Sequence, residues 1–89
     1  MSAPTLAAGL ELDASALPRE FDGVRFVRVI DRRRGHAAWW QSHCSRARIY
    51  TTFAGYGASV DGKVIRGDYA SLNFAMRSAA RALKGLFHG

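Results

Sequence analysis

The pair Asp61-Gly62 is the strongest local structural signal in the sequence. Both residue types tolerate the positive φ angles of a type I′ turn, which suits the twist of a two-residue β-hairpin. Short segments with β-branched residues, ASV before the pair and KVI after it, can supply the two strands. The sequence therefore predicts an antiparallel hairpin at this point.

A second hairpin is predicted upstream. Residues 24–30 (VRFVRVI) are mostly β-branched or aromatic, as is typical of a strand. The run RRRG (Arg32–Gly35) then predicts a turn, after which residues 37–44 (AAWWQSHC) resume an extended pattern. Adjacent residues of a strand point to opposite faces, so one of the neighbouring Trp39 and Trp40 is expected in the core.

Residues 46–54 alternate between two kinds of side chain. The face expected in the core carries Ala47, Ile49, Thr51 and Phe53. The opposite face carries Arg46, Arg48, Tyr50 and Thr52. The glycines of GYG (Gly55–Gly57) predict a bend or bulge directly afterwards, because glycine gives up side-chain packing for backbone freedom.

The C-terminal segment predicts an amphipathic helix. Its apolar side consists of Leu72, Ala75, Met76, Ala79, Leu83 and Leu86. Its polar side consists of Asn73, Arg77, Arg81, Lys84 and His88. Asp68 or Ser71 is expected to cap the start of the helix, and Gly85 is expected to end it.

These elements define the expected fold class as α+β, a small antiparallel sheet of three to four strands with the C-terminal amphipathic helix packed on one face. With 89 residues, the chain has room for one domain and one modest core. Residues 1–20 are expected to form an N-terminal arm or a short packed element. Residues 21–89 are expected to form a single basic domain.

Charge is distributed unevenly along the chain. Residues 1–22 hold one basic and four acidic residues, whereas residues 23–89 hold twelve basic and three acidic ones, a balance of +9. Eleven of the thirteen basic residues are arginine, which suits bidentate contacts with phosphate and stacking on bases. GC-rich coding is the other explanation for the arginine content. The body of the domain is expected to attract polyanions or acidic protein surfaces.

The sequence favours no catalytic or metal-binding function. His36, His43, Cys44 and His88 lack the spacing of metal ligands, so neither a metal ion nor another cofactor is expected. Cys44 is expected to be a small buried residue, and the chain is expected not to be an enzyme. A single cysteine, no visible secretory signal and no apolar stretch of about 18 residues predict a cytoplasmic protein without a membrane partner.

The remaining candidates for function are cations and one tyrosine on three elements. This set consists of Arg32, Arg33, Arg34, Arg46, Arg48, Tyr50, Arg77, Arg81 and Lys84. Trp39, Trp40 and Tyr56 are further candidates for stacking. Cations neutralise phosphate and aromatic rings stack on bases, so the set predicts binding of nucleic acid or a nucleoprotein complex. The alternative is an inhibitor or adaptor that docks on an acidic protein surface. An exposed sheet edge would also permit a homodimer.

From Ser59 onward, the sequence SVDGKVIRGDYASLNFAMRSAARALKGL resembles the hairpin-plus-helix half of double-stranded-RNA-binding domains. That family opens this helix with lysines that clamp phosphate, whereas Leu72 and Asn73 stand here. By this resemblance, the clamp is either missing here or displaced to Arg77 and Arg81. The same unit is similar to that of small phage proteins such as anti-CRISPR inhibitors. This second resemblance implies a non-enzymatic interface with a host nucleoprotein complex.

Overall fold

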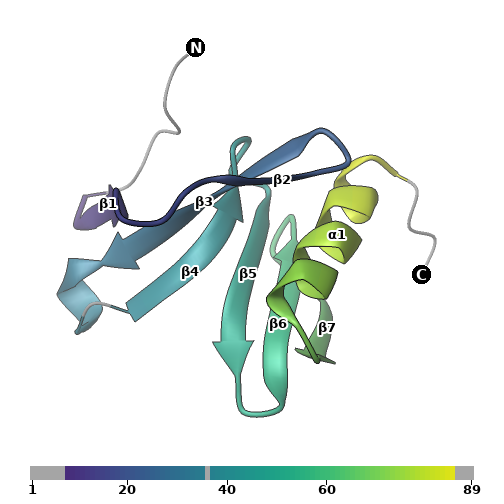
Figure 1. Cartoon of the computed structure of the whole chain (residues 1–89). Coiled ribbons are helices and arrows are strands. Elements are labelled where there is room, and N and C mark those ends of the chain that lie inside the picture. Colours follow the sequence, from purple (N-terminus) through teal and green to yellow (C-terminus); the bar gives the residue numbers. More distant parts are fainter. Residues whose placement is uncertain (1–7, 36, 86–89) are drawn as a thin grey trace.

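The structure, a computed structural model, describes residues 8–35 and 37–85. Within these residues it contains one antiparallel sheet of seven strands, with one α-helix packed on it (Figure 1). The elements are β1 (Leu10–Leu12), β2 (Arg19–Phe21), β3 (Val24–Asp31), the 3-10 helix η1 (Arg32–Arg34), β4 (Ala37–Ser42), β5 (Ala47–Thr52), β6 (Gly55–Val60), β7 (Lys63–Tyr69) and α1 (Leu72–Leu83). The α+β class is confirmed.

The predicted sheet of three to four strands is wrong: residues 24–69 already form five strands, and the N-terminal segment adds two more. β1 and β2 both pair with β3 and share its outer edge, one at each end. A second Asp-Gly pair, Asp22-Gly23, joins β2 to β3 with φ angles of 50° and 79°. Strands of three residues show no periodic pattern, so pairing with β3, and not composition, makes these segments extended.

Both predicted hairpins are present. Asp61 and Gly62 have φ angles of 53° and 81°, as a type I′ turn between β6 and β7 requires. The arginine run forms η1 between β3 and β4, and Gly35 leaves it with a left-handed φ of 65°. The predicted irregularity near GYG is confirmed as register shifts between β6 and β7 over residues 56–59.

The hydrophobic core lies between α1 and one face of the sheet. Its buried members are Phe26, Ala47, Ile49, Ala58, Tyr69, Ala75, Met76, Ala79 and Ala80. Ser71 caps the helix by accepting a hydrogen bond from the Phe74 N–H at 3.1 Å. Thr51 and Phe53 are exposed against expectation, because Thr51 lies beyond the cover of the helix and Phe53 falls in the turn after β5. Leu86 and His88 lie outside the described residues.

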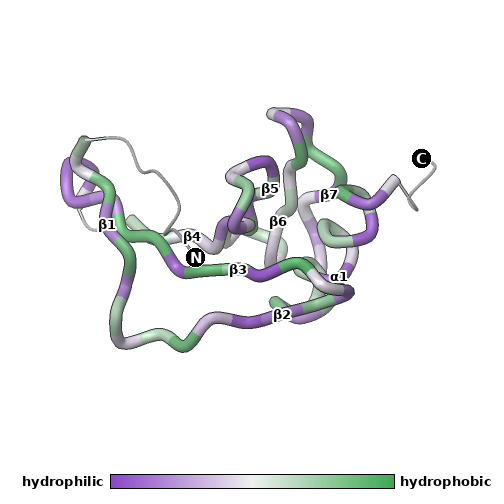
Figure 2. The backbone as a smooth tube through the Cα atoms, turned by 90° about the horizontal axis from the view of Figure 1, so that it is seen from above, coloured by the Kyte–Doolittle hydropathy of each residue, from purple (hydrophilic) through white to green (hydrophobic). Residues whose placement is uncertain are grey.

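The helix covers only part of the sheet. It contacts β2, β5, β6 and β7, and Figure 2 shows it beside the β2 end of β3, far from β1. The sheet face opposite α1, called here the open face, carries no helix within the described residues (Figure 1). The β3–β4 hairpin with η1 at its tip therefore extends past α1 at one side of the molecule.

Candidate nucleic-acid interface

The site is built around a place where two neighbouring strands separate. β4 and β5 pair only at Trp40↔Ile49 and Gln41↔Arg48, although each strand has six residues. Beyond the Trp40↔Ile49 pair the two strands diverge (Figure 1). The divergence opens the sheet between Ala38 and Thr51, so the sheet has a gap within it as well as two outer edges.

A groove of about 660 Å³ follows this gap on the open face. Its lining includes Arg34, Trp39, Arg46, Arg48 and Tyr50. Strand alternation places Trp39, Arg48 and Tyr50 there, because their neighbours Trp40 and Ile49 point to the opposite, helix-covered face. Four of the nine predicted site residues thus meet in one groove, together with a tryptophan.

Arg48 and Trp39 form a stacked pair across the β4–β5 boundary. The guanidinium carbon of Arg48 lies 4.4 Å from the centroid of the Trp39 ring. The Trp39 indole N–H donates a hydrogen bond of 3.1 Å to Oε1 of Gln41, which is itself buried. A buried partner fixes the orientation of the indole, so the pair forms a rigid platform with a positive charge on top.

Tyr50 lies flat on the open face because its partner on β6 has no side chain. Tyr50 pairs with Gly57, and a Cβ atom on Gly57 would stand 2.5 Å from the Tyr50 ring. The ring thus occupies the space of the missing side chain, as aromatic residues do when they cover a glycine on a neighbouring strand. GYG therefore positions a groove residue in addition to making a bulge.

Arg46 at the groove edge is held by the hairpin turn. Its Nε and one terminal guanidinium nitrogen each donate a hydrogen bond of 2.9 Å to the two carboxylate oxygens of Asp61. The hydrogen bond from Arg46 lowers the pKa of Asp61, and the carboxylate in turn raises the pKa of Arg46. Both side chains are exposed, so a phosphate can compete with Asp61 for the guanidinium.

This ion pair makes the folding stability depend on pH. Since the folded-state pKa of Asp61 lies below its unfolded value, its stabilisation is complete above about pH 4 and is lost as the pH falls through the folded-state pKa. We expect Asp61→Asn to reduce the loss of stability between pH 6 and pH 3, measured by urea denaturation. Asparagine tolerates the positive φ of this turn.

Asp22→Asn is the matched control for this experiment. Asp22 also precedes a glycine in a turn with positive φ, but it has no ion pair among the described residues. An unchanged acid sensitivity in Asp61→Asn would contradict the role assigned to the Arg46–Asp61 pair.

The arginine turn is organised by one buried carboxylate. Asp31 accepts a hydrogen bond of 3.0 Å from the Arg33 backbone N–H, and its oxygens lie 3.4 Å from Arg33 Nε and 3.8 Å from Arg34 Nε. Arg32 pairs separately with Glu11 of β1 at 2.8 Å. Arg34 keeps 81% of its side chain exposed and reaches the groove, whereas Arg32 and Arg33 do not line it.

The three helix residues of the predicted site stand apart from the groove. Arg77 and Arg81 are exposed on α1 and Lys84 is exposed at its C-cap, and the buried side of α1 packs on the face of the sheet opposite the groove. Arg77 lies 6.0 Å from the Phe21 ring, at the β2 side of the molecule. The nine residues thus form no single surface: four line the groove, three lie on the helix side, and Arg32 and Arg33 lie in the arginine turn outside the groove. The sequence pattern alone cannot show this separation, because it does not indicate which face of the sheet the helix covers.

From the sequence, Trp39 is one of several aromatic residues that could stack on a base, and nothing distinguishes it from Trp40. The available signal was the adjacent pair itself: Trp40 packs against the core, as expected for one of the two, which leaves Trp39 for the other face. The partners of Trp39, Arg48 and Gln41, become visible only when β4 pairs with β5.

The part of the chain that the structure describes forms no metal site. No group of three His, Cys, Asp or Glu residues there could hold a metal ion, and the candidate ligands His36 and His88 lie outside it. Cys44 is exposed, not buried as expected, because it lies in the turn after β4. Among these same residues, no helix has the length and apolar character needed to cross a membrane.

Comparisons with known proteins place this chain in no family. No family model, no curated protein and no solved structure matches it. The resemblances to double-stranded-RNA-binding domains and to anti-CRISPR inhibitors therefore stay predictions.

Proposed function

We propose that this protein binds single-stranded nucleic acid in the groove on the open face, without catalysis. The observation that carries the proposal is the Arg48–Trp39 stack at 4.4 Å inside a groove that Arg34, Arg46 and Tyr50 also line. Sequence-tolerant binding of single strands combines cations that follow the backbone with aromatic rings that stack on bases. The groove holds both kinds of group within one continuous surface.

A single strand fits this surface better than a duplex does. Stacking on Trp39 or Tyr50 requires a base whose face is exposed, and bases in a duplex are already stacked on one another. The cations Arg34 and Arg46 stand at opposite ends of the lining, one on the β3–β4 hairpin and one beside the β6–β7 turn. A strand that crosses β4 and β5 would keep its phosphates near both.

Binding is expected to weaken with salt in a predictable way. Three groove cations predict a slope of about −2 in log affinity against log salt, at about 0.7 per phosphate for single strands. The measurement is fluorescence anisotropy with labelled oligonucleotides of about ten nucleotides, titrated at several salt concentrations.

Two double variants test where the strand binds. Arg46→Gln with Arg48→Gln removes two groove charges, and we expect it to reduce both the affinity and the salt slope. Arg77→Gln with Arg81→Gln removes the same charge from α1 and is the matched control. Equal losses in both variants would contradict the groove and indicate attraction to the net charge alone. If no oligonucleotide binds at low salt, the alternative of docking on an acidic protein surface, as an inhibitor or adaptor, replaces this proposal.

A further inference from the structure

The separation of β4 from β5 leaves backbone groups of β4 without a strand to pair with. The His43 N–H donates to the Arg25 carbonyl at 2.8 Å, so His43 and every second residue before it direct their backbone groups toward β3. The residues between them, Trp40 and Ala38, direct theirs toward β5. Trp40 finds its partner there, but Ala38 lies beyond the last pair.

The same reasoning identifies the facing residue on β5. The Ala47 N–H donates to Oγ of Ser42 on β4 at 3.0 Å, so Ala47, Ile49 and Thr51 direct their backbone groups toward β4. Ile49 is paired with Trp40, and Thr51 lies beyond that pair. The N–H and C=O groups of Ala38 and Thr51 therefore face each other across an open space, called here the slot.

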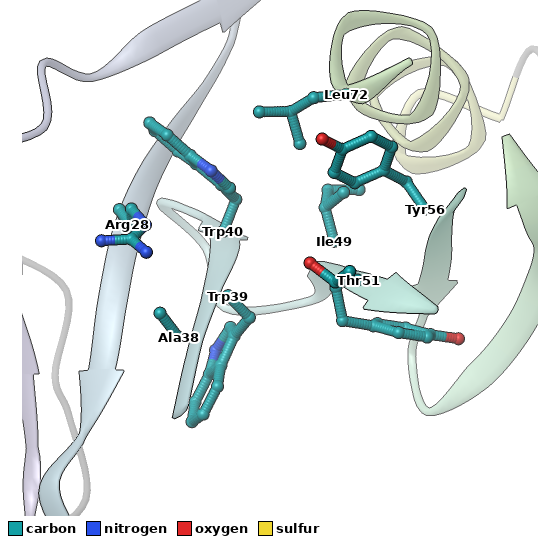
Figure 3. A pocket seen from close by; sticks show the side chains of 9 residues that line it. Arg28, Ala38, Trp39, Trp40, Ile49, Thr51, Tyr56 and Leu72 are labelled. Carbon is teal, nitrogen blue, oxygen red and sulfur yellow. The ribbon is translucent and has the colours of Figure 1, made fainter. Parts of the chain in front are cut away.

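The slot continues from the groove into a cavity on the helix side of the sheet. This cavity has a volume of about 200 Å³, and Ala38 and Thr51 line both it and the groove. Figure 3 looks into it, with Ala38 and Trp40 on the β4 side and Ile49, Thr51 and Tyr56 across from them. A cavity of about 150 Å³ accommodates one benzene ring, so this one has room for a single six-membered ring.

The lining of the cavity combines an aromatic wall with hydrogen-bonding groups. Trp40 offers the wall, and the hydroxyl groups of Thr51 and Tyr56 add to the backbone groups of the slot (Figure 3). Arg28 closes the β3 side, where it is ion-paired with Asp13. A planar ring that carries donors and acceptors on its edge would satisfy these groups, and an aliphatic side chain would not.

We propose that the slot takes one pyrimidine base, turned out of the bound single strand, and reads its edge. The inference rests on the proposed function, since the groove must first hold the strand. The ring enters between β4 and β5 and lies near Trp40, while Ala38 and Thr51 offer a backbone donor and acceptor from either side. The volume of about 200 Å³ is close to the roughly 150 Å³ that holds one six-membered ring, so we expect single-ring pyrimidines to be preferred over two-ring purines.

The first test fills the cavity. The side chain of Ala38 points to the same face as that of Trp40, so Ala38→Leu places an isobutyl group where the base would lie. We expect the wild-type protein to bind oligo-dT about tenfold more tightly than oligo-dA of equal length, as one lost base contact would predict. Ala38→Leu should lower the affinity for oligo-dT to that for oligo-dA and leave the salt slope unchanged.

Ala54→Leu is the matched control, because it adds the same side chain at the exposed β5–β6 turn. It should leave the preference for oligo-dT intact. If Ala38→Leu binds both oligonucleotides as the wild type does, the slot is not a base site, although the groove would still be one. If the wild type binds neither, the proposed function fails and the slot proposal fails with it.

A second measurement needs no variant. In the free protein the amides of Ala38 and Thr51 should exchange with solvent quickly, because no strand pairs with them. Oligo-dT should slow the hydrogen exchange of both amides, and oligo-dA should slow the exchange of neither. NMR measures these exchange rates. Binding of oligo-dT without a change at either amide would overturn the proposal. Slower exchange of these amides with an extended peptide, but not with oligo-dT, would also overturn the proposal. It would identify the slot as a site where a peptide strand adds to the sheet.

Discussion

Replacing Trp39 with alanine is expected to weaken oligonucleotide binding by about tenfold or more. Stacking of one base on an aromatic ring contributes about 1–3 kcal/mol, and Trp39 also holds the Arg48 guanidinium carbon 4.4 Å from its own ring centroid. The substitution therefore removes a stacking surface and frees a cation that the ring had positioned. Anisotropy titration with labelled oligo-dT measures the loss.

Trp39→Phe is the control for this result. It keeps an aromatic face beneath Arg48 but loses the indole N–H that donates to Gln41. We expect most of the affinity to remain, with a small loss from a less fixed ring. Thermal unfolding of both variants separates binding from stability. Wild-type affinity in Trp39→Ala would remove the observation on which the proposed function rests.

Phe26→Ala is expected to cost about 3–5 kcal/mol of unfolding free energy, a large share of the total for a domain of this size. Phe26 is completely buried and belongs to the cluster between α1 and the sheet. It also lies on β3, which pairs with β1, β2 and β4, so a cavity there would loosen the strand that joins the N-terminal segment to the rest of the sheet. Urea denaturation gives the value.

Phe53→Ala makes the same chemical change at a fully exposed position in the β5–β6 turn. We expect it to alter stability by less than about 0.5 kcal/mol, as is usual for surface substitutions. Similar losses in the two variants would mean that the core does not lie where the structure places it. The comparison of these two variants also tests the sequence pattern, because periodicity alone predicts Phe53 in the core.

Most of the fold follows from local signals in the sequence. The Asp61-Gly62 turn, the alternation at Ala47 and Ile49, and the Ser71 cap are each determined by a few neighbouring residues. β1 and β2 are not determined in this way, because each becomes a strand only by pairing with β3. The Asp22-Gly23 pair is the same kind of local turn signal, but β2 before it has only three residues and shows no periodic pattern.

The site is less predictable than the fold, because it depends on which strands fail to pair. The sequence identified Arg34, Arg46, Arg48 and Tyr50, but it also grouped them with Arg77, Arg81 and Lys84. Only the packing of α1 separates those two sets. The gap between Ala38 and Thr51 has no sequence signature, since both segments look like ordinary strands until the register shows where pairing stops.

The two tryptophans on β4 also tie the folding of this strand to its use. A shift of one residue in its pairing would exchange Trp39 with Trp40 and turn the Gln41 amide into the hydrophobic interior, far from Ser45. Such a misfolded form would move Trp39 away from Arg48 and place the Gln41 amide among apolar side chains. Errors in strand alignment are thus penalised by Trp39 and Gln41, two of the residues that build the Arg48–Trp39 platform.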